Sequence, residues 1–132
     1  MHKAKRTNKR SGFTMIELMA VLIILGLLST VAMTKFIGQI DRAKRTTTKT
    51  NLGILHSAII NYRMDVGSYP EEGDPGLYAL IEQPGDAEGW QPGGYLESTN
   101  LPLDGWKKEF IYVRDYDENT PFVIISLGAD GE

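Results

Sequence analysis

The feature that most constrains this chain is an uncharged apolar run at residues 18–34, LMAVLIILGLLSTVAMT. As a helix it would measure about 25 Å at roughly 1.5 Å per residue, which is the lower limit for crossing a bilayer. Burial inside a soluble protein is disfavoured because the run has no polar face. An ordinary secretory signal would end in a small-residue cleavage site, which Ser29, Thr30 and Ala32 imitate only weakly. We therefore predict one membrane-spanning helix.

Charge is distributed unevenly along the chain. The net charge is +5 over residues 1–12, −1 over residues 13–34, +5 over residues 35–63 and −12 over residues 64–132, for a total of −3. The first basic cluster should stay in the cytoplasm, because lysines and arginines that flank a membrane helix are retained there. The C-terminal region is then expected outside the cytoplasm. Its negative charge argues against nucleic acid as a partner.

Residue types that build catalytic and metal centres are scarce. The chain has no cysteine and two histidines, which excludes a disulfide scaffold, a thiol nucleophile and Cys-ligated metal. His56 has no acid or second histidine at i±4, so we assign it to the surface or to packing. Residues 115–119 resemble the start of an EF-hand loop, but Thr120 stands where that loop needs glycine, which favours a hairpin turn. No catalytic motif is present, and we predict that the chain is not an enzyme.

Periodicity predicts an α+β fold. Apolar residues at three- and four-residue spacing continue the first helix, which we expect over residues 14–65, with Gly67 as its C-terminal cap and Pro70 preventing resumption. The positions of that stripe are Phe36, Ile40, Ala43, Thr47, Ile54, Ala58 and Tyr62, widened by Leu52, Leu55 and Ile59.

The rest of the chain is predicted to form a loop followed by a small sheet. We expect a short helix near residues 75–82, an ordered loop to residue 102, and antiparallel strands at 108–113 and 121–127 joined by a hairpin at 115–120. The long helix should pack on this sheet. Trp90, Tyr95 and Trp106 are expected to pack in the core or at a subunit interface rather than to bind a ligand.

Residues 11–19, SGFTMIELM, resemble the type III leader junction of type IV pilins and pseudopilins. The resemblance implies a pilin-like fold and a basic leader, residues 1–12, that a prepilin peptidase removes between Gly12 and Phe13. Phe13 would then be N-methylated. The remaining segments would be a transmembrane or filament-core helix at 13–35, an amphipathic helix at 36–67 and a head at 68–132.

Glu17 admits two interpretations. As an acid in the first turn of the helix it would be favoured by the macrodipole and could sit at the membrane interface. The resemblance implies a sharper role, in which Glu17 pairs with the Phe13 amine of a neighbouring subunit inside a filament. Such a pair would fix subunit register, because removing one partner strands the other in an apolar environment.

Five segments of the head resemble the major pseudopilins of type II secretion: 62–70, 76–80, 94–96, 101–106 and 126–131. That family binds one calcium ion near the C-terminus, which here would use the Leu127 carbonyl and the Asp130 carboxylate. The sequence given ends at Glu132, where the family continues in an acidic tail. We therefore expect either a weaker calcium site completed by Glu132, carbonyls and water, or a solvated acidic C-terminus.

The resemblance implies a structural subunit that polymerises from the bacterial inner membrane into a periplasmic pseudopilus, which pushes exoproteins through an outer-membrane secretin. Its expected partners are further copies of the chain, minor pseudopilins, the inner-membrane assembly platform and the prepilin peptidase. A minor pseudopilin, a type IV pilin or a competence filament subunit remains an alternative. A membrane-anchored periplasmic enzyme or binding protein would leave the junction at Gly12 and Phe13 and the acid at Glu17 unexplained.

Overall fold

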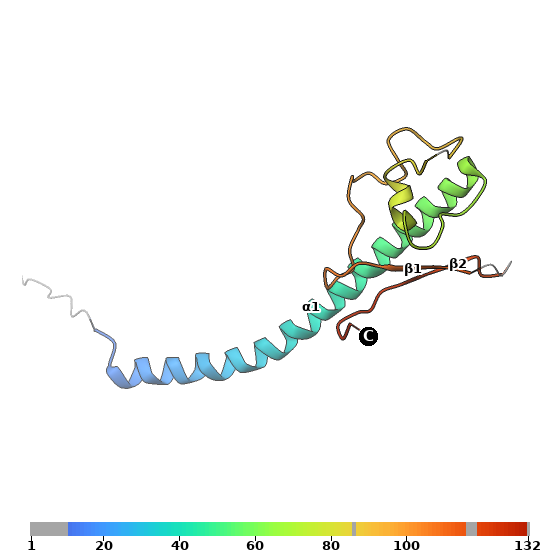
Figure 1. The fold of residues 1–132 in the computed structure, drawn as a ribbon. Coiled ribbons are helices and arrows are strands. Elements are labelled where there is room, and N and C mark those ends of the chain that lie inside the picture. The colour runs from blue at the N-terminus through green and yellow to red at the C-terminus, as the bar shows by residue number, and fades with distance from the viewer. Residues whose placement is uncertain (1–10, 86, 116–118, 132) are drawn as a thin grey trace, which may run out of the picture. The chain divides into compact units, whose positions relative to one another are not determined.

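The computed structural model describes residues 11–85, 87–115 and 119–131. The chain divides into two compact units, Met1–Gln39 and Ile40–Glu132 (Figure 1). Most of the expected leader, the middle of the expected hairpin connection and the candidate calcium ligand Glu132 lie outside the described residues.

One helix, α1, runs from Met15 to Val66, within one residue of the predicted bounds at each end. Its C-terminus is capped as expected. Gly67 adopts a left-handed conformation with φ +88°, and its N–H donates to the Arg63 carbonyl at 2.8 Å. Glycine takes this conformation without the steric cost that other residues incur, so the helix ends where the sequence supplies one.

The helix is continuous through Gly26, Gly38 and Gly53. A Cβ atom at any of the three would meet nothing within 4 Å in the single chain. These glycines are therefore not required by packing within one copy.

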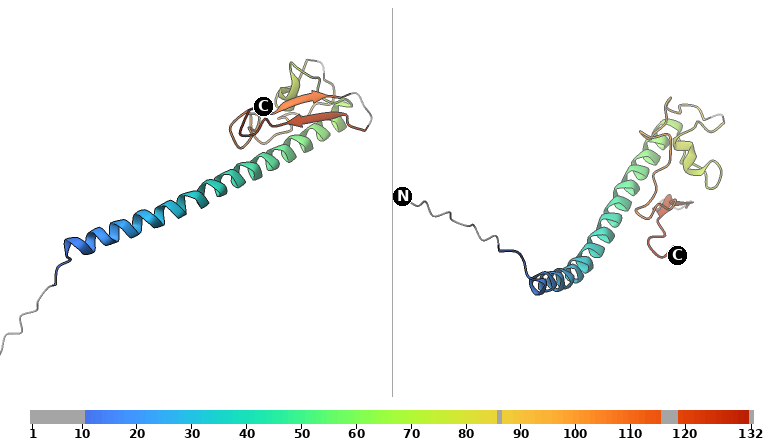
Figure 2. Two further views of the ribbon diagram at one scale, coloured as in Figure 1. Left: turned by 90° about the horizontal axis from the view of Figure 1, so that it is seen from below. Right: turned by 90° about the vertical axis from the view of Figure 1, so that its left-hand side faces the viewer.

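The sheet consists of β1, Ile111–Arg114, and β2, Phe122–Ile125, which pair antiparallel as predicted (Figure 2). The register places Ile111 opposite Ile125 and Arg114 opposite Phe122. Both strands are shorter than the predicted 108–113 and 121–127. The reason is local hydrogen bonding: the Lys108 N–H and carbonyl both bond to Asp104, and the Gly131 N–H folds back onto the Leu127 carbonyl.

The segment between α1 and β1 is ordered, as the sequence predicts. A single 3₁₀ turn, η1, covers Gly76–Leu80 inside the predicted helical segment at 75–82. The long loop after it is fixed by two bonds to the end of η1: the Trp90 indole donates to the Ala79 carbonyl, and the Tyr95 N–H donates to the Leu80 carbonyl, both at 2.8 Å.

The core of the second unit lies between α1, η1 and β1. Its fully or nearly buried apolar residues are Leu55, Ala58, Ile59, Tyr62, Tyr69, Leu77, Ala79, Leu80, Phe110 and Tyr112. Of the predicted apolar stripe, Leu55, Ala58, Ile59 and Tyr62 are buried in this core. Phe36, Ile40 and Ile54 are exposed, and Thr48, which is not in the predicted stripe, is buried. Helical spacing shows which residues share a face, but it does not show what covers that face.

Candidate functional site

The first turn of α1 is closed by a reciprocal pair of side chains, Thr14 and Glu17. The Thr14 N–H and hydroxyl both donate to Oε2 of Glu17, at 3.0 and 3.1 Å, and the Glu17 N–H donates to the Thr14 hydroxyl at 3.3 Å. This is a capping box, which satisfies two backbone N–H groups that have no partner inside the helix.

No role was predicted for Thr14 from the amino-acid sequence. The signal was present, because a threonine followed three residues later by a glutamate, ahead of an apolar run, is the sequence pattern of a capping box. The first-turn interpretation of Glu17 is therefore realised in the single chain, and it acts through a specific hydrogen-bonded pair as well as through the macrodipole.

Gly12 and Phe13 lie immediately before the capped turn, in backbone that is not helical. Phe13 is 94% exposed, and Gly12 is exposed, with nothing within 4 Å of the position that a Cβ atom would take there. The Glu17 carboxylate contacts the N–H of Thr14, the residue that follows Phe13. The predicted junction thus directly precedes the turn that contains the predicted assembly acid.

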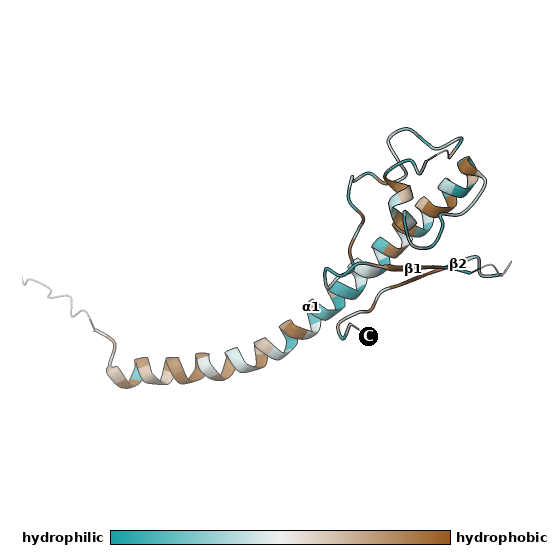
Figure 3. Cartoon of the chain, in the orientation of Figure 1, coloured by the Kyte–Doolittle hydropathy of each residue, from teal (hydrophilic) through white to brown (hydrophobic). Residues whose placement is uncertain are grey.

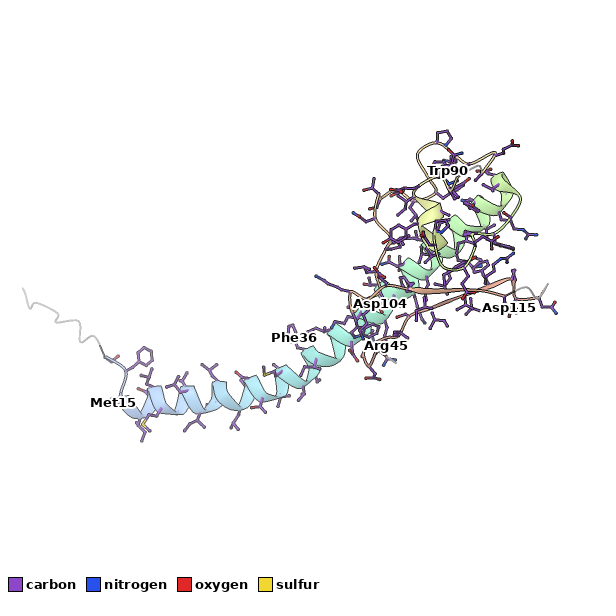
Figure 4. The ribbon with its side chains drawn as sticks, in the orientation of Figure 1. Met15, Phe36, Arg45, Trp90, Asp104 and Asp115 are labelled. Carbon is purple, nitrogen blue, oxygen red and sulfur yellow. The ribbon has the colours of Figure 1, made fainter. Side chains whose placement is uncertain are left out.

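No large apolar side chain between Met15 and Ile40 is buried. The least exposed of them, Val21, is 51% exposed. Apolar colour dominates this part of α1 in Figure 3, and Figure 4 shows its side chains projecting without cover between Met15 and Phe36. Within the described part of the chain, α1 is the one helix long and apolar enough to cross a membrane.

Hydroxyl groups inside the apolar run are bonded to the backbone of the same helix. Ser29 donates to the Leu25 carbonyl at 2.7 Å, and Thr30 donates to the Gly26 carbonyl at 3.1 Å. These bonds allow polar residues to enter lipid or an apolar filament core without leaving a donor unsatisfied.

The predicted calcium ligands occupy a turn at the C-terminal end of the head. The Leu127 carbonyl accepts the Gly131 N–H at 3.2 Å, and Asp130 is exposed. Among residues 11–85, 87–115 and 119–131, no three acidic or histidine side chains converge to hold a metal ion. Calcium binding at Leu127 and Asp130 stays a prediction.

Asp104, which the sequence analysis did not single out, is only 3% exposed and organises the loop before β1 (Figure 4). Its carboxylate accepts the N–H groups of Trp106 and Lys108 at 2.9 and 2.8 Å and the Ser126 hydroxyl at 2.7 Å. Burial alone would raise the pKa of this carboxyl, but these hydrogen bonds and the positive charge of Lys108 hold the pKa below its ordinary value.

The remaining candidates behave as packing residues. His56 is exposed and its ring lies 5.4 Å from the ring of Phe122. The rings of Trp90 and Tyr95 pack edge to face, with their centroids 6.0 Å apart, and both side chains pack against the core. An open groove of about 830 Å³ runs between α1 and residues 95–102, and Glu97 is the one charged side chain among its described lining residues. It presents no acid–base pair for catalysis.

Comparison with known proteins now decides the family. The model of the type II secretion system protein G family matches residues 35–132, and the prokaryotic N-terminal methylation motif matches residues 7–33, which include Gly12, Phe13 and Glu17. This chain belongs to the protein G family of type II secretion. The methylation motif and the apolar helix fit an inner-membrane-anchored pseudopilin of that family, which is structural and is not a known enzyme family.

Individual members of the family are similar in sequence to this chain over most of its length. The type II secretion system core protein G of Vibrio cholerae is 33% identical over 97% of this chain and 86% of its own length. The protein of the same name from Pseudomonas aeruginosa is 35% identical over 94% of this chain and 87% of its own length.

A solved structure supports the same conclusion. The major pseudopilin from the type 2 secretion system of enterohaemorrhagic Escherichia coli superimposes with a TM-score of 0.59 at 29% identity, covering 73% of this chain and 83% of the other. The pilin-like fold predicted from the sequence, a long N-terminal helix with a small antiparallel sheet, is confirmed.

Proposed function

We propose that this member of the protein G family is the main structural subunit of a type II secretion pseudopilus. Subunits would leave the inner membrane and polymerise into a periplasmic filament that helps to push exoproteins through the outer-membrane secretin. The observation that carries the proposal is the uncovered apolar part of α1. A surface of this size is not left in water, and lipid before assembly and other copies after assembly would cover it.

The charge pattern supports one orientation in the membrane. Residues 1–12 carry +5 and would stay in the cytoplasm, while residues 64–132 carry −12 and would lie in the periplasm. The positive residues between positions 35 and 49 would lie on the membrane side of the acidic head, where they could meet the heads of neighbouring copies. Minor pseudopilins and the inner-membrane assembly platform would be the further partners, and nucleic acid would not be one.

The junction between Gly12 and Phe13 would be the processing site. Its exposure and its non-helical backbone suit a peptide bond that a prepilin peptidase must reach, and Phe13 would be the residue that is methylated. Gly12→Ala should leave an unprocessed precursor in the membrane, whereas Ser11→Ala, its neighbour, should be processed normally. A mature-sized band from Gly12→Ala on a gel would contradict this assignment.

Glu17 would serve the monomer and the filament in different ways. In the monomer its Oε2 atom caps Thr14. In the filament its charge would pair with the Phe13 amine of a neighbour. In an apolar surrounding the loss of one charge leaves the other uncompensated, so the pair would enforce register more than it would add net stability.

The two roles can be separated by substitution, because glutamine can also close a capping box. Glu17→Gln should keep the first turn of α1 and a folded head but prevent filament formation. Thr14→Ala removes the cap, keeps the charge and should reduce filament yield far less. Filament yield is read by electron microscopy of sheared material, and the head fold by tryptophan fluorescence. A normal filament yield from Glu17→Gln would overturn the pairing role.

A further inference from the structure

A positive charge from another segment, the Lys108 side chain, contacts the C-terminal turn of the head. The Lys108 ammonium donates to the carbonyl of Gly128 at 3.0 Å in a partly buried setting. It also lies against Gly131: a Cβ atom at that position would be only 2.7 Å from the Lys108 nitrogen. The ammonium group therefore occupies space inside the turn formed by residues 127–131.

Lys108 is held there by a continuous set of hydrogen bonds. Its backbone N–H donates to Asp104, and Asp104 also accepts the Ser126 hydroxyl. The Ser126 hydroxyl in turn accepts the N–H of Gly128, whose carbonyl accepts the Lys108 ammonium. These hydrogen bonds join the loop before β1 to the turn after β2. The negative charge of Asp104 and the positive charge of Lys108 both belong to this network.

The described residues of this turn do not make a calcium site. Calcium requires six to eight oxygen ligands, and several are normally carboxylates. In residues 119–131 the one carboxylate is that of Asp130, which is exposed. A divalent ion placed in this turn would also meet the Lys108 ammonium, which repels it.

We propose that Lys108 takes the place of a metal ion in this head, so that its ammonium orders the 127–131 turn and the turn needs no calcium. An ammonium carries three donors and no acceptor, and it can bind carbonyl oxygens as a small cation does. A charge-assisted hydrogen bond of this kind is stronger than a neutral one, which allows one side chain to order a short turn. The proposal does not depend on the filament function.

The test uses the full chain in detergent micelles, with either excess EGTA or millimolar calcium. Hydrogen exchange of a peptide covering residues 126–131 reports the turn, and tryptophan fluorescence reports the melting temperature of the head. We expect the wild type to show the same protection and the same melting temperature in both buffers. Protection that is lost from the wild type in EGTA would overturn the proposal, and this arm requires no variant.

Three substitutions make the test specific. Lys108→Met should lose protection of the turn in both buffers and lower the melting temperature by roughly 5 °C. Lys107→Met, which removes the exposed neighbouring lysine, should behave like the wild type. Lys108→Arg, which keeps a positive charge, should retain more protection than Lys108→Met. Equal protection in Lys108→Met and Lys107→Met, or equal loss in Lys108→Met and Lys108→Arg, would contradict the role of the charge.

Discussion

Residues 15–39 and residues 40–66 belong to the same unbroken helix, yet they are covered in opposite ways. In the first stretch every large apolar side chain is more than half exposed, whereas the second stretch buries Leu55, Ala58, Ile59 and Tyr62. Helix formation depends on neighbours within a few residues, but burial depends on what the rest of the chain brings to that face. The second stretch completes a core within one copy, while the first needs lipid or further copies.

The largest expected effect separates these two stretches by their contribution to the stability of the head. Ile59 is fully buried, so Ile59→Ala should lower the free energy of unfolding of the head by about 2–5 kcal/mol, through lost apolar contacts and the cavity that remains. Denaturant unfolding followed by tryptophan fluorescence measures it, because Trp90 and Trp106 both lie in the second unit.

Leu25→Ala is the matched control in the exposed stretch. It should change the free energy of unfolding of the head by less than about 0.5 kcal/mol, while it removes apolar surface that lipid or other copies would cover. If Ile59→Ala and Leu25→Ala destabilised the head equally, the two stretches would not differ in their contribution to its stability.

An intermediate effect is expected at Asp104, which acts only within the second unit. Asp104→Asn should destabilise the head by about 1–3 kcal/mol at neutral pH, because a buried carboxylate with three protein donors is replaced by a group that cannot accept all of them.

The pH dependence of that effect has a defined sign. The pKa of Asp104 is lowered by folding, so its ionised form contributes stability above the ordinary value of about 3.9, and that contribution is lost as pH falls through the lowered folded value. The difference in unfolding free energy between the wild type and Asp104→Asn should therefore shrink between neutral pH and acid below pH about 4. A difference that stays constant over this range would refute the assignment, and Glu97→Gln serves as a surface control.

The smallest effect is expected at Gly26, where a Cβ atom would meet nothing in the single chain. Gly26→Ala should raise the helix stability of the monomer by about 0.5–1 kcal/mol, because glycine in a helix interior loses more backbone entropy than alanine. Circular dichroism during thermal melting in micelles measures this gain. If Gly26 provides close contact between copies, the same variant should also lower filament yield, and unchanged yield would exclude that contact.

Local signals accounted for much of the fold. The bounds of α1, its cap at Gly67 and the antiparallel pair of strands followed from apolar periodicity, glycine placement and strand propensity. At the candidate site, the leader junction and Glu17 were visible as a motif, and the capping role of Thr14 could have been recognised from its spacing to Glu17. Each of these signals lies within a few residues along the chain.

The amino-acid sequence by itself determined that this chain would carry a long apolar helix, an acidic head and a processing motif, because composition and spacing are local properties. Only the tertiary structure decided which face of α1 is buried, with Thr48 inside and Ile54 outside. It also decided that Asp104 and Lys108 would meet Ser126 and Gly128, about twenty residues away. Those outcomes depend on contacts between distant segments, which no local pattern of residues specifies.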